Sequence, residues 1–100
     1  MRIIAKSRLK AYWEKSGNEQ AKPHLNEWYH FCLEQQWSTP QNVRNTLSHA
    51  SFIKENRVVF NVNGNHHRII CSIFYPAKIM SIKFVGTHSE YEQIDVNTVE

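Results

Sequence analysis

The residues whose types could do chemistry together lie in the stretch KFVGTHSEYEQID, from Lys83 to Asp95. Thr87 and Glu90 fit the capping-box pattern, so a helix is expected to begin at His88 and to bring Tyr91 to the same side one turn later. An imidazole can exchange a proton near neutral pH, and a tyrosine offers a hydroxyl beside it. The stretch therefore predicts a strand that ends beside an active site. The alternative is an ordinary strand exit with a partly exposed histidine.

Two cations belong to the same prediction. Arg68 and Lys83 fall on outward positions of neighbouring strands, close to the end where His88 would lie. Arginine offers a two-pronged fork to phosphate and lysine a point charge. Metal-free cleavage of RNA needs such cations to stabilise the developing charge, and acid and base groups to move protons. We therefore predict Arg68, Lys83, His88 and Tyr91 as catalytic residues.

Other chemical sites receive less support from the sequence. His66 and His67 look like a metal pair, but adjacent residues of a strand point to opposite faces. Asp and Glu do not cluster as a metal-dependent nuclease requires, and Cys32 and Cys71 lie far apart in the chain. We therefore predict neither a metal nor a cofactor.

Helical patterns fill the first half of the chain. The apolar segment RIIA predicts a short first strand, and Ser7 could cap a helix that ends near Gly17. Apolar residues then recur at helical spacing from about residue 21 to 36, which predicts an amphipathic helix. Thr39 followed by Pro40 predicts the N-cap and first residue of a third, short helix.

From residue 51 the hydrophobic period changes to two, which is typical of strands. Strands are expected at 57–62, 66–75 and 78–85, with the first two joined by an Asn63-Gly64 hairpin turn. The order predicts one α+β domain over residues 1–100, with helices on one face of an antiparallel sheet and a short C-terminal helix. The face towards the helices should carry Ile69, Ile73, Ile82 and Phe84, and the open face Asn61, Arg68 and Lys83.

Charge and composition narrow the class of partner. The hydrophobic fraction is 41% and the formal net charge is +3. The segment from Ser38 to His88 contains six Lys and Arg residues and a single acidic residue, Glu55. A basic segment of this kind favours binding to a polyanion such as RNA. The acidic end, residues 90–100, is interpreted as a solvated tail, and a contact with a partner protein is the alternative. No apolar run is long enough to span a membrane, so a soluble cytoplasmic domain is expected.

The segments FNVNGNHHRII and IKFVGTHSEYEQID resemble the HigB-type toxins of bacterial type II toxin–antitoxin systems, within the RelE-like superfamily. The resemblance implies a RelE-like fold and an mRNA interferase that needs no metal and cleaves messenger RNA on the translating ribosome. The 2′-hydroxyl would attack the adjacent phosphate. It also implies a HigA-type helix-turn-helix antitoxin, through which alone the toxin would meet operator DNA.

The same resemblance assigns roles residue by residue. It implies that Arg68 stabilises the phosphate, that Lys83 fills a basic position, and that His88 and Tyr91 transfer protons or stack on a base. It leaves open which of His88 and Tyr91 is the general base. The expected RNA-binding residues are Lys54, Arg57, Asn61 and Asn65. Of these, Asn61 and Asn65 would chiefly fix the geometry of the hairpin. The alternative function is a non-catalytic RNA- or protein-binding module that acts through its antitoxin complex.

Overall fold

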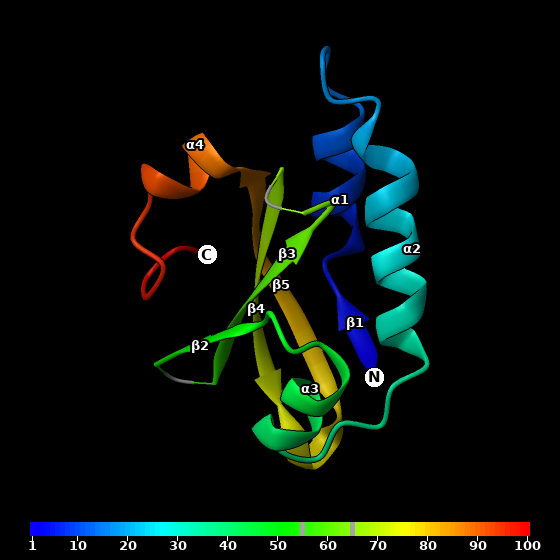
Figure 1. Ribbon diagram of the computed structural model, residues 1–100, viewed down its shortest axis with the longest axis vertical. Coiled ribbons are helices and arrows are strands. Elements are labelled where there is room, and N and C mark those ends of the chain that lie inside the picture. Colours follow the sequence, from blue (N-terminus) through cyan, green and yellow to red (C-terminus); the bar gives the residue numbers. More distant parts are fainter. Residues whose placement is uncertain (55, 65) are drawn as a thin grey trace.

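The computed structural model describes residues 1–54, 56–64 and 66–100. Turns and loops join its helices and strands (Figure 1). In chain order the elements are β1 (Arg2–Ile4), α1 (Lys6–Trp13), α2 (Ala21–Leu33), α3 (Pro40–Thr46), β2 (Ser51–Ile53), β3 (Arg57–Val62), β4 (His67–Phe74), a 3-10 turn (Tyr75–Ala77), β5 (Ile79–Thr87) and α4 (His88–Glu92).

The strands form one five-stranded sheet in the order β1-β5-β4-β3-β2. β3, β4 and β5 make the expected antiparallel meander, and this arrangement confirms the α+β class. Two details differ from the sequence prediction. β1 lies parallel to β5, so the sheet is mixed, and β2 adds a short strand at the other edge.

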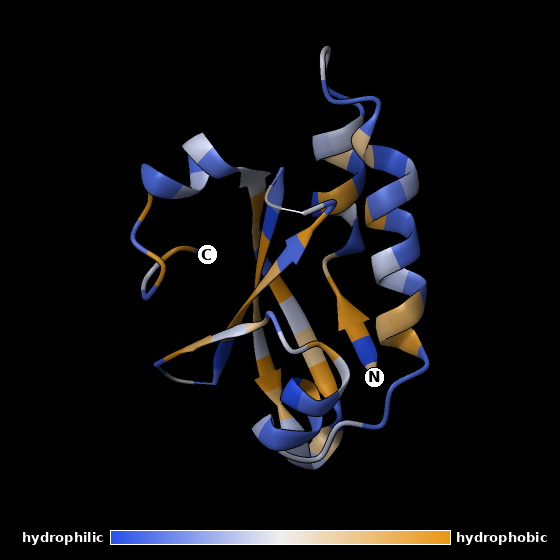
Figure 2. Ribbon diagram, viewed as in Figure 1, coloured by the Kyte–Doolittle hydropathy of each residue, from blue (hydrophilic) through white to orange (hydrophobic). Residues whose placement is uncertain are grey.

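The main core lies between the sheet and the layer formed by α1 and α2 (Figure 1). The outer side of α2 is mostly hydrophilic and its inner side apolar (Figure 2), as the helical spacing predicts. Phe60 lies at the centre, with its ring 5.4 Å from the ring of Trp28 and 6.3 Å from that of Trp37. Burial of these aromatic rings helps to hold α2 on the sheet, while α1 packs through Leu9, Tyr12 and Trp13.

The helix starts were predicted with mixed success. Thr39 is the N-cap of α3, and its hydroxyl accepts from the backbone N–H of Asn42 at 3.2 Å, as predicted. Ser7 does not cap α1. That helix begins at Lys6, two residues before the start that a Ser7 cap would give, and its N-cap position is occupied by Ala5, with a φ of 73°.

A β-bulge in β5 changes which of its side chains face the helices. Cys71 of β4 pairs with Ile82, but the next pair is Ile70 with Phe84, so Lys83 has no partner. The extra residue reverses the alternation beyond it. Ile69, Ile73 and Ile82 join the main core as expected. The prediction for Phe84 was wrong, because Phe84 shares the opposite face with Ile70.

The face away from α1 and α2 is partly covered by the chain after α4 (Figure 1). Arg57, only 7% exposed, donates from Nη1 to the carbonyl oxygens of Val96 at 3.3 Å and Val99 at 2.6 Å. The acidic side chains of the tail, Glu90, Glu92, Asp95 and Glu100, are exposed as expected, but its backbone is attached to the sheet. A buried guanidinium requires acceptors, and here the backbone of the tail supplies them.

Replacing Arg57 by methionine should lower the free energy of unfolding by about 2 kcal/mol, because hydrogen bonds from a charged donor contribute roughly 1.5–3 kcal/mol. Urea denaturation measures this change. Lys54→Met is the matched control, since Lys54 is exposed and should change stability by less than about 0.5 kcal/mol. Equal stability of the two variants would show that the tail is not held by Arg57.

Candidate active site

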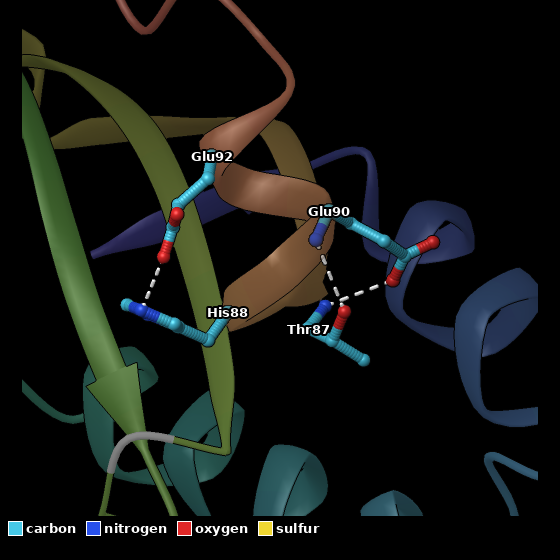
Figure 3. Close-up of polar contacts among 4 residues, drawn as sticks. All are labelled: Thr87, His88, Glu90 and Glu92. Carbon is cyan, nitrogen blue, oxygen red and sulfur yellow. Dashed lines mark hydrogen bonds and ion pairs between the residues drawn. The ribbon is translucent and has the colours of Figure 1, made fainter.

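α4 begins with the predicted capping box, drawn in Figure 3. The Thr87 hydroxyl accepts from the backbone N–H of Glu90 at 3.2 Å, and the Glu90 carboxylate accepts from the backbone N–H of Thr87 at 2.9 Å. These reciprocal bonds fix the angle at which α4 leaves β5. They place His88 at the first helical position and Tyr91 one turn further on.

His88 has a carboxylate partner that the sequence prediction did not include. Its Nε2 lies 2.5 Å from Oε1 of Glu92, and the two side chains are 51% and 59% exposed (Figure 3). The i,i+4 spacing on a helix is the signal that could have found this pair. A carboxylate on one ring nitrogen orients the imidazole and leaves the other nitrogen, Nδ1, for a substrate.

Arg68 and Tyr91 meet on the sheet face opposite to the helix layer. The guanidinium carbon of Arg68 lies 4.8 Å from the centroid of the Tyr91 ring, within the range of a cation–π contact. Both side chains are half-buried. Among the residues that the structure describes, Arg68 forms no ion pair with a carboxylate. Its charge is therefore held in place by an aromatic ring, which does not neutralise it.

Asn61 and Gly86 flank Arg68 on the two neighbouring strands, in direct cross-strand register. Oδ1 of Asn61 and Nε of Arg68 are buried and have no hydrogen-bond partner among the residues that the structure describes. Such atoms are uncommon in folded proteins, and they occur at functional sites. A Cβ on Gly86 would lie 2.6 Å from the ring of Phe84 and 3.2 Å from Cβ of Glu90, so only glycine lets that ring and α4 approach so closely.

Lys83 lies further from Arg68 than the sequence suggested. Lys83 is the unpaired residue of the bulge, and Arg68 pairs with Gly86. Lys83 comes three positions before Gly86, a separation of about 10 Å along a strand. Its carbonyl oxygen accepts from Nη1 of Arg8 in α1 at 3.1 Å. Its distance from Arg68 indicates that Lys83 is not adjacent to the Arg68–Tyr91 pair.

The expected RNA-binding residues do not gather with that pair either. Arg57 begins β3, four residues before Asn61 and thus about 13 Å along the strand. Its buried side chain is engaged by the C-terminal tail, so the predicted RNA contact of Arg57 is not supported. Lys54 is exposed beyond that far end of β3, and Asn65 lies outside the described residues.

A comparison with protein families identifies the family of the chain. The model of the HigB_toxin family, described as the RelE-like toxic component of a toxin-antitoxin system, matches residues 21–94. The chain belongs to the HigB toxin family. It is thus the toxin of a toxin–antitoxin system, and an antitoxin partner is implied. No curated protein matched the chain.

This HigB-family chain also has a cleft of about 480 Å³ on the helix side of the strand ends. It lies between the α1–α2 turn, the β3–β4 hairpin and the start of α4, and we call it the histidine cleft after four of its lining residues, His24, His66, His67 and His88. His66 belongs to the turn before β4, so the alternation expected for the His66-His67 pair does not apply, and both residues line the cleft.

His67 is the anchored histidine of this HigB-family cleft. Its Nδ1 shares a hydrogen bond of 3.0 Å with the Tyr12 hydroxyl, and the two rings meet edge to face. Burial lowers the pKa of His67, and repulsion from His66 and His24 lowers it further. The ring is therefore biased towards its neutral form.

Two general features of the described part of this HigB-family chain bear on its chemistry. Within residues 1–54, 56–64 and 66–100, no group of three or more His, Cys, Asp or Glu side chains could hold a metal ion. None of the described helices has the length and hydrophobicity needed to cross a membrane.

Proposed function

We propose that this toxin is a metal-independent endoribonuclease, an mRNA interferase, that cleaves messenger RNA on the translating ribosome. The observation that supports this best is the Arg68–Tyr91 pair. Arg68, which has no carboxylate partner in the described part of the chain, lies over the ring of Tyr91. Tyr91 is on the same short helix as His88. A guanidinium fork binds the oxygens of a carboxylate or a phosphate in two-pronged geometry, and a phosphodiester is the ligand proposed for Arg68.

The proposed reaction uses the side chains of α4 and β4. His88 accepts the proton of the ribose 2′-hydroxyl through Nδ1, because Glu92 occupies Nε2. The 2′-oxygen then forms a bond to the adjacent phosphorus while the bond from phosphorus to the 5′-oxygen breaks. That oxygen leaves with a proton from the Tyr91 hydroxyl. The products are a 2′,3′-cyclic phosphate and a 5′-hydroxyl.

Each cation has a separate place in this proposal. Arg68 stabilises the charge that develops on the phosphate oxygens during attack. Lys83, about 10 Å along β5, would contact a flanking phosphate rather than the scissile one. Lys54 would touch the RNA backbone further along the strand. Asn61 would hold the site geometry beside Arg68.

The proposed partners follow from the charge and the family. A net charge of +3 is small for tight binding of free RNA at physiological salt, so the ribosome would supply most of the affinity. We propose that the toxin acts in the cytoplasm and that a HigA-type helix-turn-helix antitoxin neutralises it. Operator DNA would be reached only through that antitoxin.

The test compares naked messenger with messenger under translation in a reconstituted system, at the same concentration of antitoxin-free toxin. The proposal predicts cuts only under translation, with cyclic phosphate ends on the upstream fragments. Efficient cleavage of naked messenger would contradict ribosome dependence. A folded toxin that cuts neither RNA would instead be a non-catalytic binding module.

A further inference from the structure

The histidine cleft combines a suitable size with hydrogen-bonding groups that are largely uncharged. Its volume of about 480 Å³ falls within the roughly 300–1,000 Å³ that small-molecule sites occupy. Besides the four histidines it is lined by the amides of Asn18, Gln20 and Asn63, while none of its described lining residues is Lys, Arg, Asp or Glu. These side chains can both donate and accept hydrogen bonds.

This lining differs in kind from the Arg68–Tyr91 face. The negative charge of a phosphate is met chiefly by Arg and Lys, which are missing from the described lining of the cleft. The amides of Asn and Gln can pair with the donors and acceptors of a base edge, as they do with adenine. Histidine rings also stack on bases that have left the helical stack. The chemistry of the cleft therefore suits a nucleobase better than a phosphate.

The position of the cleft connects it to the proposed reaction centre. His67 pairs with Thr87 in the sheet register, and the next pair is Arg68 with Gly86. Neighbouring strand residues point to opposite faces, so the cleft and the Arg68 face lie back to back at one end of the sheet. α4 borders both, because His88 lines the cleft and Tyr91 contacts Arg68.

Part of the cleft is held by hydrogen bonds, and part of it is exposed to solvent. The Tyr12 hydroxyl holds the His67 ring, and Nδ2 of Asn18 donates to the Tyr12 carbonyl oxygen at 3.1 Å. His24 and His66 are exposed at the rim, with the His66 ring 6.4 Å from the His67 ring. A fixed floor with polar groups at the rim is suited to holding a flat ring and contacting its edge.

We propose that the histidine cleft binds the base of a nucleotide next to the scissile phosphate and thereby sets the base preference of cleavage. The proposal rests on the proposed ribonuclease activity for its substrate. His24 and His66 contact the edge of the base, His67 forms the floor, and the RNA backbone crosses the strand ends towards Arg68.

Binding can be tested without any cleavage. The four ribonucleoside 5′-monophosphates and inorganic phosphate are each titrated into the antitoxin-free toxin, and the histidine ring signals are followed by NMR. The expected result is a shift of the His24, His66 and His67 signals that differs among the four bases. Dissociation constants should span roughly tenfold, as one good base contact gives. His30 and His49, which do not line the cleft, should not respond.

Two results of this titration would overturn the proposal. An equal shift with inorganic phosphate alone would make the cleft an anion site, and no shift with any nucleotide would show that it binds none. A toxin that binds bases here but cuts no RNA would instead contradict only the ribonuclease proposal.

The second test uses His24→Ala and His66→Ala, with His30→Ala as the control, since His30 is an exposed histidine on the same helix as His24. The first two variants should flatten the base distribution around the cleavage sites, and the control should leave it unchanged. An unaltered distribution in both cleft variants would contradict the proposed reading of the base.

Discussion

Replacing Arg68 by alanine is expected to lower the rate of messenger cleavage by about 10²–10³, the loss typical of removing one group that stabilises developing charge. Arg68 lies on the Tyr91 ring and forms no ion pair with a carboxylate among the described residues, so its charge is available to the phosphate. The single-turnover rate on translated messenger measures the effect. Growth arrest on induction should disappear with it.

The structure offers a matched control for this substitution. Arg44 is an exposed arginine whose guanidinium carbon lies 4.3 Å from the centroid of the Phe52 ring, a similar cation–π contact outside the proposed site. Arg44→Ala should cleave at the natural rate. If both variants fold and lose activity to the same degree, the effect is one of general charge, and Arg68 has no special role.

Replacing His88 by alanine is expected to lower the cleavage rate by about 10²–10⁴, the contribution of a positioned acid or base. Glu92→Gln should cause a smaller loss, because the amide can still accept a hydrogen bond from Nε2 but no longer carries the charge that stabilises an imidazolium. Both substitutions are at exposed positions of α4, so the stability of the fold should hardly change.

Two substitutions of Tyr91 distinguish the role of its ring from the role of its hydroxyl. Tyr91→Phe retains the ring under Arg68 and removes only the proposed proton donor, whereas Tyr91→Ala removes both. We expect the phenylalanine variant to be slower than the natural toxin and the alanine variant to be slower still. A natural rate in His88→Ala, with loss of activity in Tyr91→Phe, would transfer the role of base to Tyr91.

Local sequence rules were sufficient where the structure is determined by neighbouring residues. The α4 capping box and the Thr39 cap depend on residues three apart, and both form as predicted. The meander was readable from a period of two and from the Asn63-Gly64 turn, where both residues have positive φ. Arg68 and Tyr91 are predicted site residues that the structure brings together.

The features that were missed depend on contacts between distant parts of the chain. One extra residue at Lys83 reverses the faces of β5, and alternation alone gives no sign of a bulge. The hydrogen bonds from Arg57 reach the carbonyl groups of Val96 and Val99, which are 39 and 42 positions further along the chain. Because these acceptors are distant in the sequence, the positive charge of Arg57 suggested an RNA contact. The histidine cleft is likewise assembled from three separate segments.

The most direct test of the central claim is cleavage mapping of messenger in cells after brief induction, comparing the natural toxin with Arg68→Ala and Arg44→Ala. The account predicts cuts confined to translated regions in the natural toxin and in Arg44→Ala, and none in Arg68→Ala. Unchanged cuts in a folded Arg68→Ala toxin, or no cuts by the natural toxin free of its antitoxin, would contradict it.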